Sequence, residues 1–139
     1  MSVPTIVAER VLSAAKAAQD KLAEHVLALE VGERLGIADV FLILSGGSER
    51  QVEAIAEAVE DALREEHNEL PLRREGRGSG HWVLLDYGDF VVHVQHPEDR
   101  AFYALDRLWS SSPRLELPGI EQSEAPAELP ETESGAQPA

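Results

Sequence analysis

Cysteine is absent from this chain of 139 residues, and basic residues are scarce. Without cysteine there is no disulfide bond, zinc–thiolate site or thiol nucleophile, so a metal site would need histidine and carboxylate ligands. The 12 Lys and Arg residues stand against 26 Asp and Glu residues, which gives a formal net charge of −14. Such a charge repels phosphate backbones and argues against direct nucleic-acid binding as the main source of affinity. A basic partner is the better expectation.

Long apolar runs are also absent. No run approaches the ~20 apolar residues that a membrane span requires. The N-terminus has neither the apolar core of a secretory signal nor the arginine-rich pattern of a transit peptide. We therefore expect a cytoplasmic protein without membrane contact. The length suits one compact domain with a sizeable core.

The composition changes after Trp109. Residues 110–139 hold six glutamates, one arginine, no aromatic residue and five prolines, namely Pro113, Pro118, Pro126, Pro130 and Pro138. Such a segment buries too little apolar surface to offset the entropy lost on ordering. We expect a folded domain over residues 1–110 and a disordered acidic tail, rich in Pro and Glu, over residues 111–139.

Three segments show the periodicity of amphipathic helices. The first runs from Pro4 to about residue 24, with an apolar stripe of Val7, Val11, Ala14, Ala15, Ala18 and Leu22. The second runs from Ser48 to about residue 66, where Ser48 and Gln51 have the spacing of a capping box. The third begins at Pro97, a residue tolerated in a first helical turn. Its expected buried stripe is Ala101, Ala104, Leu105 and Leu108.

Five strand candidates lie between these helices, at about residues 25–31, 39–45, 70–74, 82–87 and 89–95. The apolar run at 41–44 does not alternate, which is typical of a central strand covered on both faces. Gly88, between Tyr87 and Asp89, is suited to a hairpin turn. The order αββαβββα predicts an α/β (α+β) single domain with a mixed sheet of about five strands packed by helices.

The turn of Ser45, Gly46, Gly47 and Ser48 leaves a strand and opens a helix, so its amides could bind an anion or a nucleotide phosphate. The spacing matches neither a Walker loop nor a dinucleotide fingerprint, and a plain strand-to-helix turn capped by Ser48 is favoured. Nucleotidyltransferases also need two carboxylates on one strand, which this sequence does not supply. A nucleotide-binding protein using Gly46, Gly47 and Ser48 is kept as the alternative function.

Histidines and carboxylates near the hairpin allow a second chemical interpretation. Asp86, Asp89, His93 and His96 could form a metal site, although turn-forming aspartates and solvent-facing histidines are favoured. Neither Ser45 nor Ser48 lies in a nucleophile elbow. We therefore expect no catalytic residue, metal or cofactor.

Trp82 leads the hairpin and could be either a core anchor or the central residue of a binding surface. Arg77, His81 and Tyr87 add the arginine and aromatic character that is enriched at interfaces. Phe102, Tyr103 and Trp109 could extend this surface. The basic cluster of Arg73, Arg74 and Arg77 could make a minor contact to RNA, or could belong to a solvated flexible loop.

The motifs resemble, as an ordered set, those of the Iojap-related ribosomal silencing factor family. The resemblance spans about residues 4–110 and is carried by residues 38–52, by Arg74, Glu75 and Gly76, by the run from Trp82 to His93, and by the run from Arg100 to Trp109. It implies a fold related to nucleotidyltransferases without their catalytic site, and a protein that is not an enzyme.

The same resemblance implies how the chain acts. Family members bind protein fourteen of the large ribosomal subunit at the face that meets the small subunit, block subunit joining and so lower translation when nutrients are scarce. Relatives in organelles act in large-subunit biogenesis, and some members are dimeric, so a homodimer is a further expectation. The partner-binding residues implied by the motifs or by their place beside Trp82 are Trp82, Leu84, Asp86, Tyr87, Asp89, His93, Tyr103 and Arg77.

Overall fold

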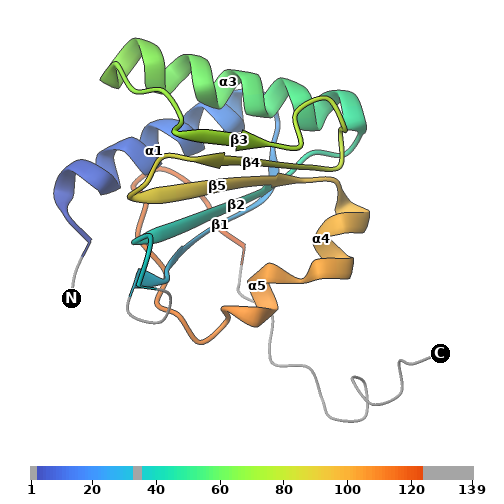
Figure 1. Ribbon diagram of the computed structural model, residues 1–139. Helices are drawn as coiled ribbons and strands as arrows, with labels where there is room; N and C mark the ends of the chain where they lie inside the picture. Colours follow the sequence, from blue (N-terminus) through green and yellow to red (C-terminus); the bar gives the residue numbers. More distant parts are fainter. Residues whose placement is uncertain (1–2, 33–35, 124–139) are drawn as a thin grey trace.

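A five-stranded mixed sheet forms the centre of the computed structural model, which describes residues 3–32 and 36–123. The strands lie in the order β1-β2-β5-β4-β3. Their bounds are β1 Glu24–Glu30, β2 Val40–Ser45, β3 Arg73–Glu75, β4 Trp82–Asp86 and β5 Phe90–Gln95. The central neighbours β2 and β5 are parallel, and every other pair is antiparallel. Two helices, α1 (Thr5–Asp20) and α3 (Glu49–His67), cover one face of this sheet (Figure 1).

Helix α3 is defined by signals at both of its ends. The Ser48 hydroxyl accepts a hydrogen bond from Gln51 N–H at 3.1 Å, which satisfies one of the free amides of the first turn. Asn68 ends the helix in the left-handed conformation with φ 54°, a conformation that asparagine tolerates better than most residues. The apolar residues that recur at helical spacing between these ends are all buried: Val52, Ile55, Ala56, Val59 and Leu63.

Helix α1 packs beside α3 through a stripe that contains three alanines. Its buried residues are Val7, Val11, Ala14, Ala15 and Ala18. The predicted stripe extended one residue too far, because the helix ends at Asp20 and Leu22 is 76% exposed with φ 64°. Of the helices within the described ranges, none is long and apolar enough to cross a membrane.

The predicted element order is confirmed, but the last helix differs. It consists of α4 (Pro97–Tyr103) and α5 (Leu105–Leu108), separated by Ala104 in the left-handed conformation with φ 51°. The predicted apolar stripe is wrong here: Ala101 is exposed, Ala104 and Leu105 are half-buried, and Leu108 is 61% exposed. Arg100 is the buried residue of α4 instead.

The predicted disorder of residues 111–139 is wrong for residues 113–123. Pro113 O accepts a hydrogen bond from Glu30 N–H at 2.7 Å, and Leu115 N–H donates to Ala28 O at 2.9 Å. These bonds occupy the outer edge of β1, and Leu115 and Leu117 are 7% and 3% exposed in the main core. Two leucines and an unpaired strand edge therefore outweigh the unfavourable composition. Residues 124–139 of the predicted tail lie outside the described residues.

Leu117→Ala tests whether this segment belongs to the folded domain. Because Leu117 is buried in the main core, we expect the free energy of unfolding to fall by roughly 2–4 kcal/mol. Urea denaturation measures this loss. Leu70→Ala, at a leucine that is 61% exposed, is the matched control and should change the free energy by less than about 1 kcal/mol. Equal small effects would show that residues 113–123 do not contribute to the core.

Candidate functional site: the open face of the sheet

The sheet face opposite α1 and α3 is only partly covered. Helix α5 and the following residue Trp109 lie over β1 and β2 on that side, in a small core of Leu27, Leu29, Val31, Phe41 and Ile43 with Leu105 and Trp109 at its margin. The β3, β4 and β5 side of this face is left half-exposed. We call this part the open face and define it by Arg73, Glu75, Trp82, Leu84, Asp86, Val91 and the adjacent Tyr103.

Strand alternation places the predicted residues of β4 together. Burial alternates along Trp82–Asp86, with Val83 and Leu85 buried in the main core and Trp82, Leu84 and Asp86 half-buried on the other side. Leu84 pairs with His93 of β5 across the ladder. Four predicted partner-binding residues, namely Trp82, Leu84, Asp86 and His93, therefore share one face.

Trp82 is half-buried and makes contacts on two sides. Its indole Nε1–H donates to His93 Nδ1 at 3.2 Å, which fixes one edge of the ring to the sheet. Its ring also packs against Tyr103 of α4, with 4.6 Å between ring centroids. Tyr103 is 49% exposed. The pair thus forms a partly exposed aromatic surface that is held from below.

His93 lies beneath this aromatic pair and is only 4% exposed. Its ring makes an edge contact with Phe41, with 4.7 Å between centroids. Burial lowers the pKa of His93 to about 4, so the ring is neutral at pH 7. A neutral ring with Nδ1 accepting from Trp82 carries its proton on Nε2, which is buried without a hydrogen-bond partner among the described residues. His93 supports the open face and does not itself offer a contact surface.

Charged side chains border the open face along β3. Arg73 lies 3.3 Å from Glu75 and 3.6 Å from Asp86, measured between side-chain nitrogen and oxygen atoms. Arg73 was considered only for a minor RNA contact, and Glu75 was not predicted as a site residue. The β3 register, Arg73 with Asp86 and Glu75 with Leu84, brings them there. This strand was predicted at residues 70–74, whereas β3 spans only Arg73–Glu75. A strand this short shows too little alternation for the sequence to predict which side chains lie on the open face.

Tyr87 does not lie on the open face. It follows β4 on the side of Val83 and Leu85, is 3% exposed and stacks on Phe90 with 4.9 Å between centroids. Burial raises the pKa of its hydroxyl above the ordinary value for tyrosine. This hydroxyl has no hydrogen-bond partner within the described part of the chain. The expected partner contact at Tyr87 is therefore not available in this structure, because the period of two along a strand turns this side chain into the core.

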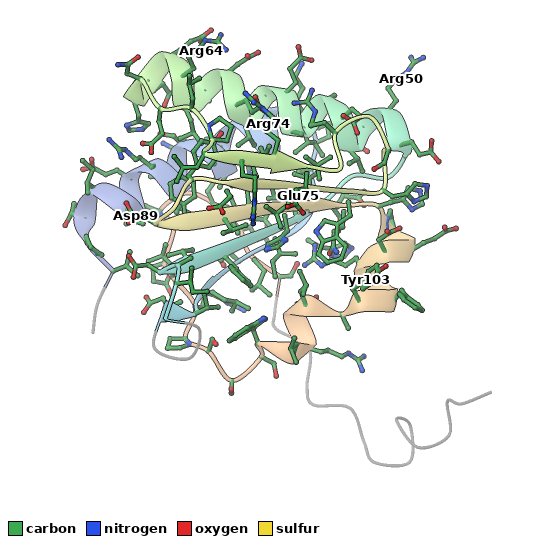
Figure 2. All side chains as sticks on the ribbon, viewed as in Figure 1. Arg50, Arg64, Arg74, Glu75, Asp89 and Tyr103 are labelled. Atoms are coloured by element: carbon green, nitrogen blue, oxygen red, sulfur yellow. The ribbon has the colours of Figure 1, made fainter. Side chains whose placement is uncertain are left out.

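Asp89 and Arg77 also lie away from the open face. Asp89 sits at the hairpin turn, at the opposite end of the sheet from Tyr103 (Figure 2), and its carbonyl accepts from Asp39 N–H at 2.7 Å. The Arg77 guanidinium binds Glu53 and Glu60 of α3 at 3.0 and 2.8 Å. Arg74 also binds Glu60. Arg74 and Arg77, two of the three arginines considered for an RNA contact, are therefore engaged in ion pairs with α3.

The loop that carries Arg77 is anchored to α3. One carboxylate oxygen of Glu53 accepts from Gly78 N–H at 2.8 Å and from Gly80 N–H at 3.0 Å. Gly80 has φ 73°, and a Cβ at this position would lie 2.4 Å from Glu49 Cβ. Only glycine fits this close approach without displacement of its neighbours. The loop is therefore tied to α3 by its own backbone, which argues against a freely flexible loop.

In the Gly46–Ser48 turn, the backbone amides of Gly46 and Gly47 donate hydrogen bonds to other parts of the chain. Gly46 N–H donates to Gln95 O at 3.1 Å, and Gly47 N–H donates to the side chain of Gln51 at 2.6 Å. The carboxylates that the alternative function would need lie toward the other end of β5: by strand length Asp89 is about 20 Å from this turn, and Asp86, opposite Val91, is about 13 Å from it. The structure thus gives the nucleotide-binding alternative no free amide at Gly46 or Gly47.

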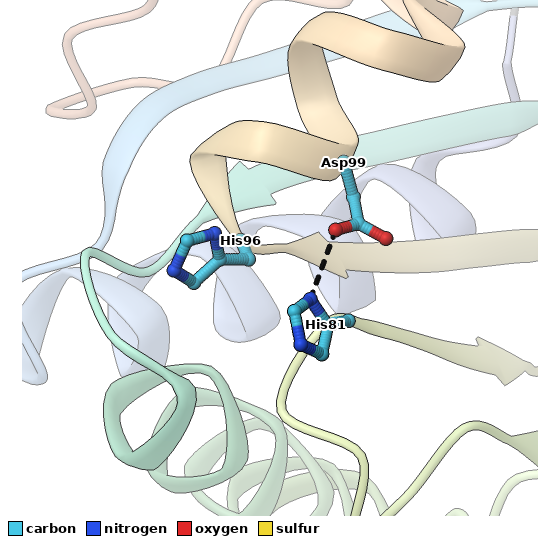
Figure 3. Close-up of side chains that lie close together, drawn as sticks. All are labelled: His81, His96 and Asp99. Carbon is cyan, nitrogen blue, oxygen red and sulfur yellow. Dashed lines mark hydrogen bonds and ion pairs between the residues drawn. The ribbon is translucent and has the colours of Figure 1, made fainter.

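The predicted metal set of Asp86, Asp89, His93 and His96 is not brought together. His93 is buried beneath Trp82, and Asp89 lies at the opposite end of β5 from His96. His96 instead lies close to His81 and Asp99 (Figure 3). Sequence reasoning missed this grouping because it depends on the antiparallel return of β4 beside β5, with His96 N–H donating to His81 O at 2.8 Å.

The fold and this site define a small single-domain α/β protein in which two helices close one sheet face and the other face stays partly open. The chain belongs to the ribosomal silencing factor family: the family model described as "Ribosomal silencing factor during starvation" matches residues 4–139. This family membership places the chain among the ribosome-related regulators of translation.

Relatives support the assignment. The chain is 46% identical over 107 residues to the "Ribosomal silencing factor RsfS" of Halalkalibacterium halodurans, covering 77% of this chain and 91% of that protein. It is 43% identical over 105 residues to the protein of the same name from Bacillus subtilis, covering 75% and 87%. It is also 33% identical to the chloroplastic protein Iojap of Zea mays, covering 77% of this chain and 46% of that protein.

Solved structures confirm the fold. A crystal structure of a protein from Bacillus halodurans aligns with a TM-score of 0.68 at 42% identity, covering 78% of this chain and 98% of that one. A crystal structure from Chromobacterium violaceum aligns with a TM-score of 0.69 at 29% identity, covering 90% and 97%. The resemblance found in the motifs is therefore confirmed at the level of family and fold.

The burial of His93 beneath Trp82 can be tested by the pH dependence of stability. Between pH 7.5 and pH 5 the unfolded His93, with an ordinary pKa near 6.5, takes up a proton, whereas the folded His93, with a pKa of about 4, does not. Stability therefore falls as the pH falls, by about 2 kcal/mol from this residue.

Urea denaturation of the wild type and of His93→Gln at both pH values measures the contribution. Other titrating groups act equally in both proteins, so the difference between the two pH profiles isolates His93. Parallel profiles would show that His93 is not held neutral by burial.

Proposed function

We propose that this chain acts in the cytoplasm as a ribosomal silencing factor by docking its open face on protein fourteen of the large ribosomal subunit. Occupying that position on the joining surface would block the small subunit sterically and lower translation under nutrient limitation. The observation that carries the proposal is the half-exposed pair of Trp82 and Tyr103 beside Leu84, in a chain whose family is that of ribosomal silencing factors.

The aromatic pair has the properties of a binding hot spot. Trp and Tyr are enriched among residues whose truncation costs the most binding energy, since they bury large areas with few rotatable bonds. The hydrogen bond from Trp82 to His93 holds the indole in place before binding, which lowers the ordering cost on association. Phe102, 79% exposed and 4.9 Å from Tyr103 between ring centroids, extends the apolar area.

Charge favours the same partner class. With a formal net charge of −14 the chain attracts basic ribosomal protein surfaces and repels exposed RNA backbone. Asp86 and Glu75 place carboxylates beside Leu84, where they can meet basic side chains. Because such charges mainly accelerate encounter and set specificity, the aromatic and aliphatic contacts supply most of the affinity. Arg77 is engaged by α3, so a minor RNA contact through it has no support here.

Trp82→Ala is the direct test. Removing the central aromatic side chain should cost about 2 kcal/mol or more of binding free energy, which weakens binding about thirtyfold. Co-sedimentation of the purified chain with separated large and small ribosomal subunits measures the binding, and a subunit-joining assay measures the block. We expect the wild type to bind the large subunit alone and to prevent joining.

Ile6→Ala is the matched control, because Ile6 is 54% exposed on α1, on the far side of the sheet. It should bind like the wild type. Circular dichroism and a thermal melt must show that Trp82→Ala remains folded. Undiminished binding by folded Trp82→Ala would contradict docking through the open face, and wild-type binding to neither subunit would contradict the proposed function itself.

A further inference from the structure

Two histidines and an aspartate lie close together where the loop of residues 76–81, the end of β5 and the start of α4 meet (Figure 3). Each of His81, His96 and Asp99 offers one ligand atom, and these atoms lie within 4.8 Å of one another. All three side chains are partly buried. The cluster is separate from the open face, and the proposed docking does not use its imidazoles.

The donor set suits a divalent transition metal. Two imidazole nitrogens and one carboxylate oxygen are the ligands with which proteins hold Zn²⁺ when thiolates are absent. His81 Nδ1 and Asp99 Oδ1 are 3.1 Å apart, near the spacing of two ligands on one ion. In the metal-free chain a proton on Nδ1 joins them, and an ion would replace that proton.

A second carboxylate, that of Glu49, lies where it can orient the His81 ring. The other ring nitrogen of His81, Nε2, lies 3.1 Å from Glu49 Oε2. A histidine that ligates a metal commonly donates its remaining N–H to a carboxylate, which orients the ring and raises its basicity. Glu49 lies in the first turn of α3, and its Cβ lies against Gly80 of the loop, which brings its carboxylate within reach of His81.

The three ligands are held by backbone structure. His96 is the N-cap of α4, and Asp99 lies in the first turn of that helix. The backbone bond from His96 N–H to His81 O joins the two histidines at 2.8 Å. Only a long bond of 3.2 Å, from Glu98 N–H to His96 Nδ1, would be displaced by coordination through that nitrogen. The acidic residues Glu98 and Asp99 offset the positive end of the short helix, which would otherwise oppose a cation.

We propose that His81, His96 and Asp99 bind one Zn²⁺ ion, with water in the remaining coordination position and Glu49 orienting His81. The ion would join the loop of residues 76–81 to the first turn of α4. Because α4 also carries Tyr103, the bound ion would limit motion of the helix that packs on Trp82. Metal binding itself does not depend on the proposed ribosomal function.

Isothermal titration calorimetry of the untagged full-length chain with Zn²⁺ tests the site, and Co²⁺ supplies a visible absorption spectrum that reports nitrogen and oxygen ligands. We expect one ion per chain and a melting temperature raised by about 4 °C or more at saturation. His96→Asn keeps an N-cap side chain while removing the imidazole. That variant and His81→Asn should each weaken Zn²⁺ binding at least tenfold.

His25→Asn is the matched control, since His25 is exposed outside the cluster and asparagine tolerates its positive φ of 52°. It should bind Zn²⁺ like the wild type. Ca²⁺ should neither raise the melting temperature nor compete, which separates a ligand site from general attraction to an acidic surface. Absence of one-to-one Zn²⁺ binding up to 1 mM, or equal binding by both cluster variants and the wild type, would overturn the proposal.

Discussion

The parallel pairing of β2 with β5 is the constraint on which the rest of the structure depends. Parallel neighbours cannot be joined by a tight turn, so the chain must cross over between them. Helix α3 makes part of that crossover and covers one sheet face (Figure 1). After it, β3 and β4 form the outer part of the sheet beside β5, with β4 antiparallel to β5 and β3 antiparallel to β4. This arrangement brings the end of β2, the end of β5 and the loop before β4 to the same edge. Arg100, His81 and His96 all lie there.

The buried polar side chains at this edge hold α4 in place. Arg100 donates to the Ser45 hydroxyl at 2.7 Å and lies 3.3 Å from Asp106 of α5. Burial lowers the pKa of Arg100, and the neighbouring Asp106 counteracts this effect. An ion pair that is largely buried is stabilising only when its geometry and its further hydrogen bonds are satisfied, so these contacts fix how α4 and α5 sit on the sheet. The position of Tyr103 over Trp82 follows from them.

Local signals in the sequence were sufficient for much of the fold. Ser48, Gln51 and the apolar stripe of α3 act within a few residues of one another, and Gly88 at the hairpin turn has φ 88°. The failures arose where a distant partner decides the outcome. Arg100 is buried because Ser45, distant in sequence, offers it a hydrogen bond, and Leu115 is ordered because β1 has a free edge. No local pattern carries that information.

The site was predictable to the extent that strand alternation applies. Trp82, Leu84 and Asp86 have a spacing of two and therefore share a face, and the same rule places Tyr87 in the core. The motif resemblance grouped Tyr87 with them because a motif does not encode the direction of each side chain. The grouping of His81, His96 and Asp99 was missed for a different reason, since it depends on the antiparallel return of β4 beside β5, which places His81 next to His96.

A regulator that acts by occupancy needs a rigid surface more than it needs reactive groups. Under the proposed function the affinity must come from contacts that are already formed in the free chain, because each side chain ordered on binding reduces the gain. Trp82 meets this requirement through its bond to His93, and His93 accepts that bond only as a neutral ring. The burial that lowers the pKa of His93 therefore also preserves the arrangement of the open face at neutral pH. Under the same proposal, the high acidic charge would increase the rate of encounter, but charge alone would not select one ribosomal protein among many basic ones. Selection must therefore rest on the fixed shape of the open face.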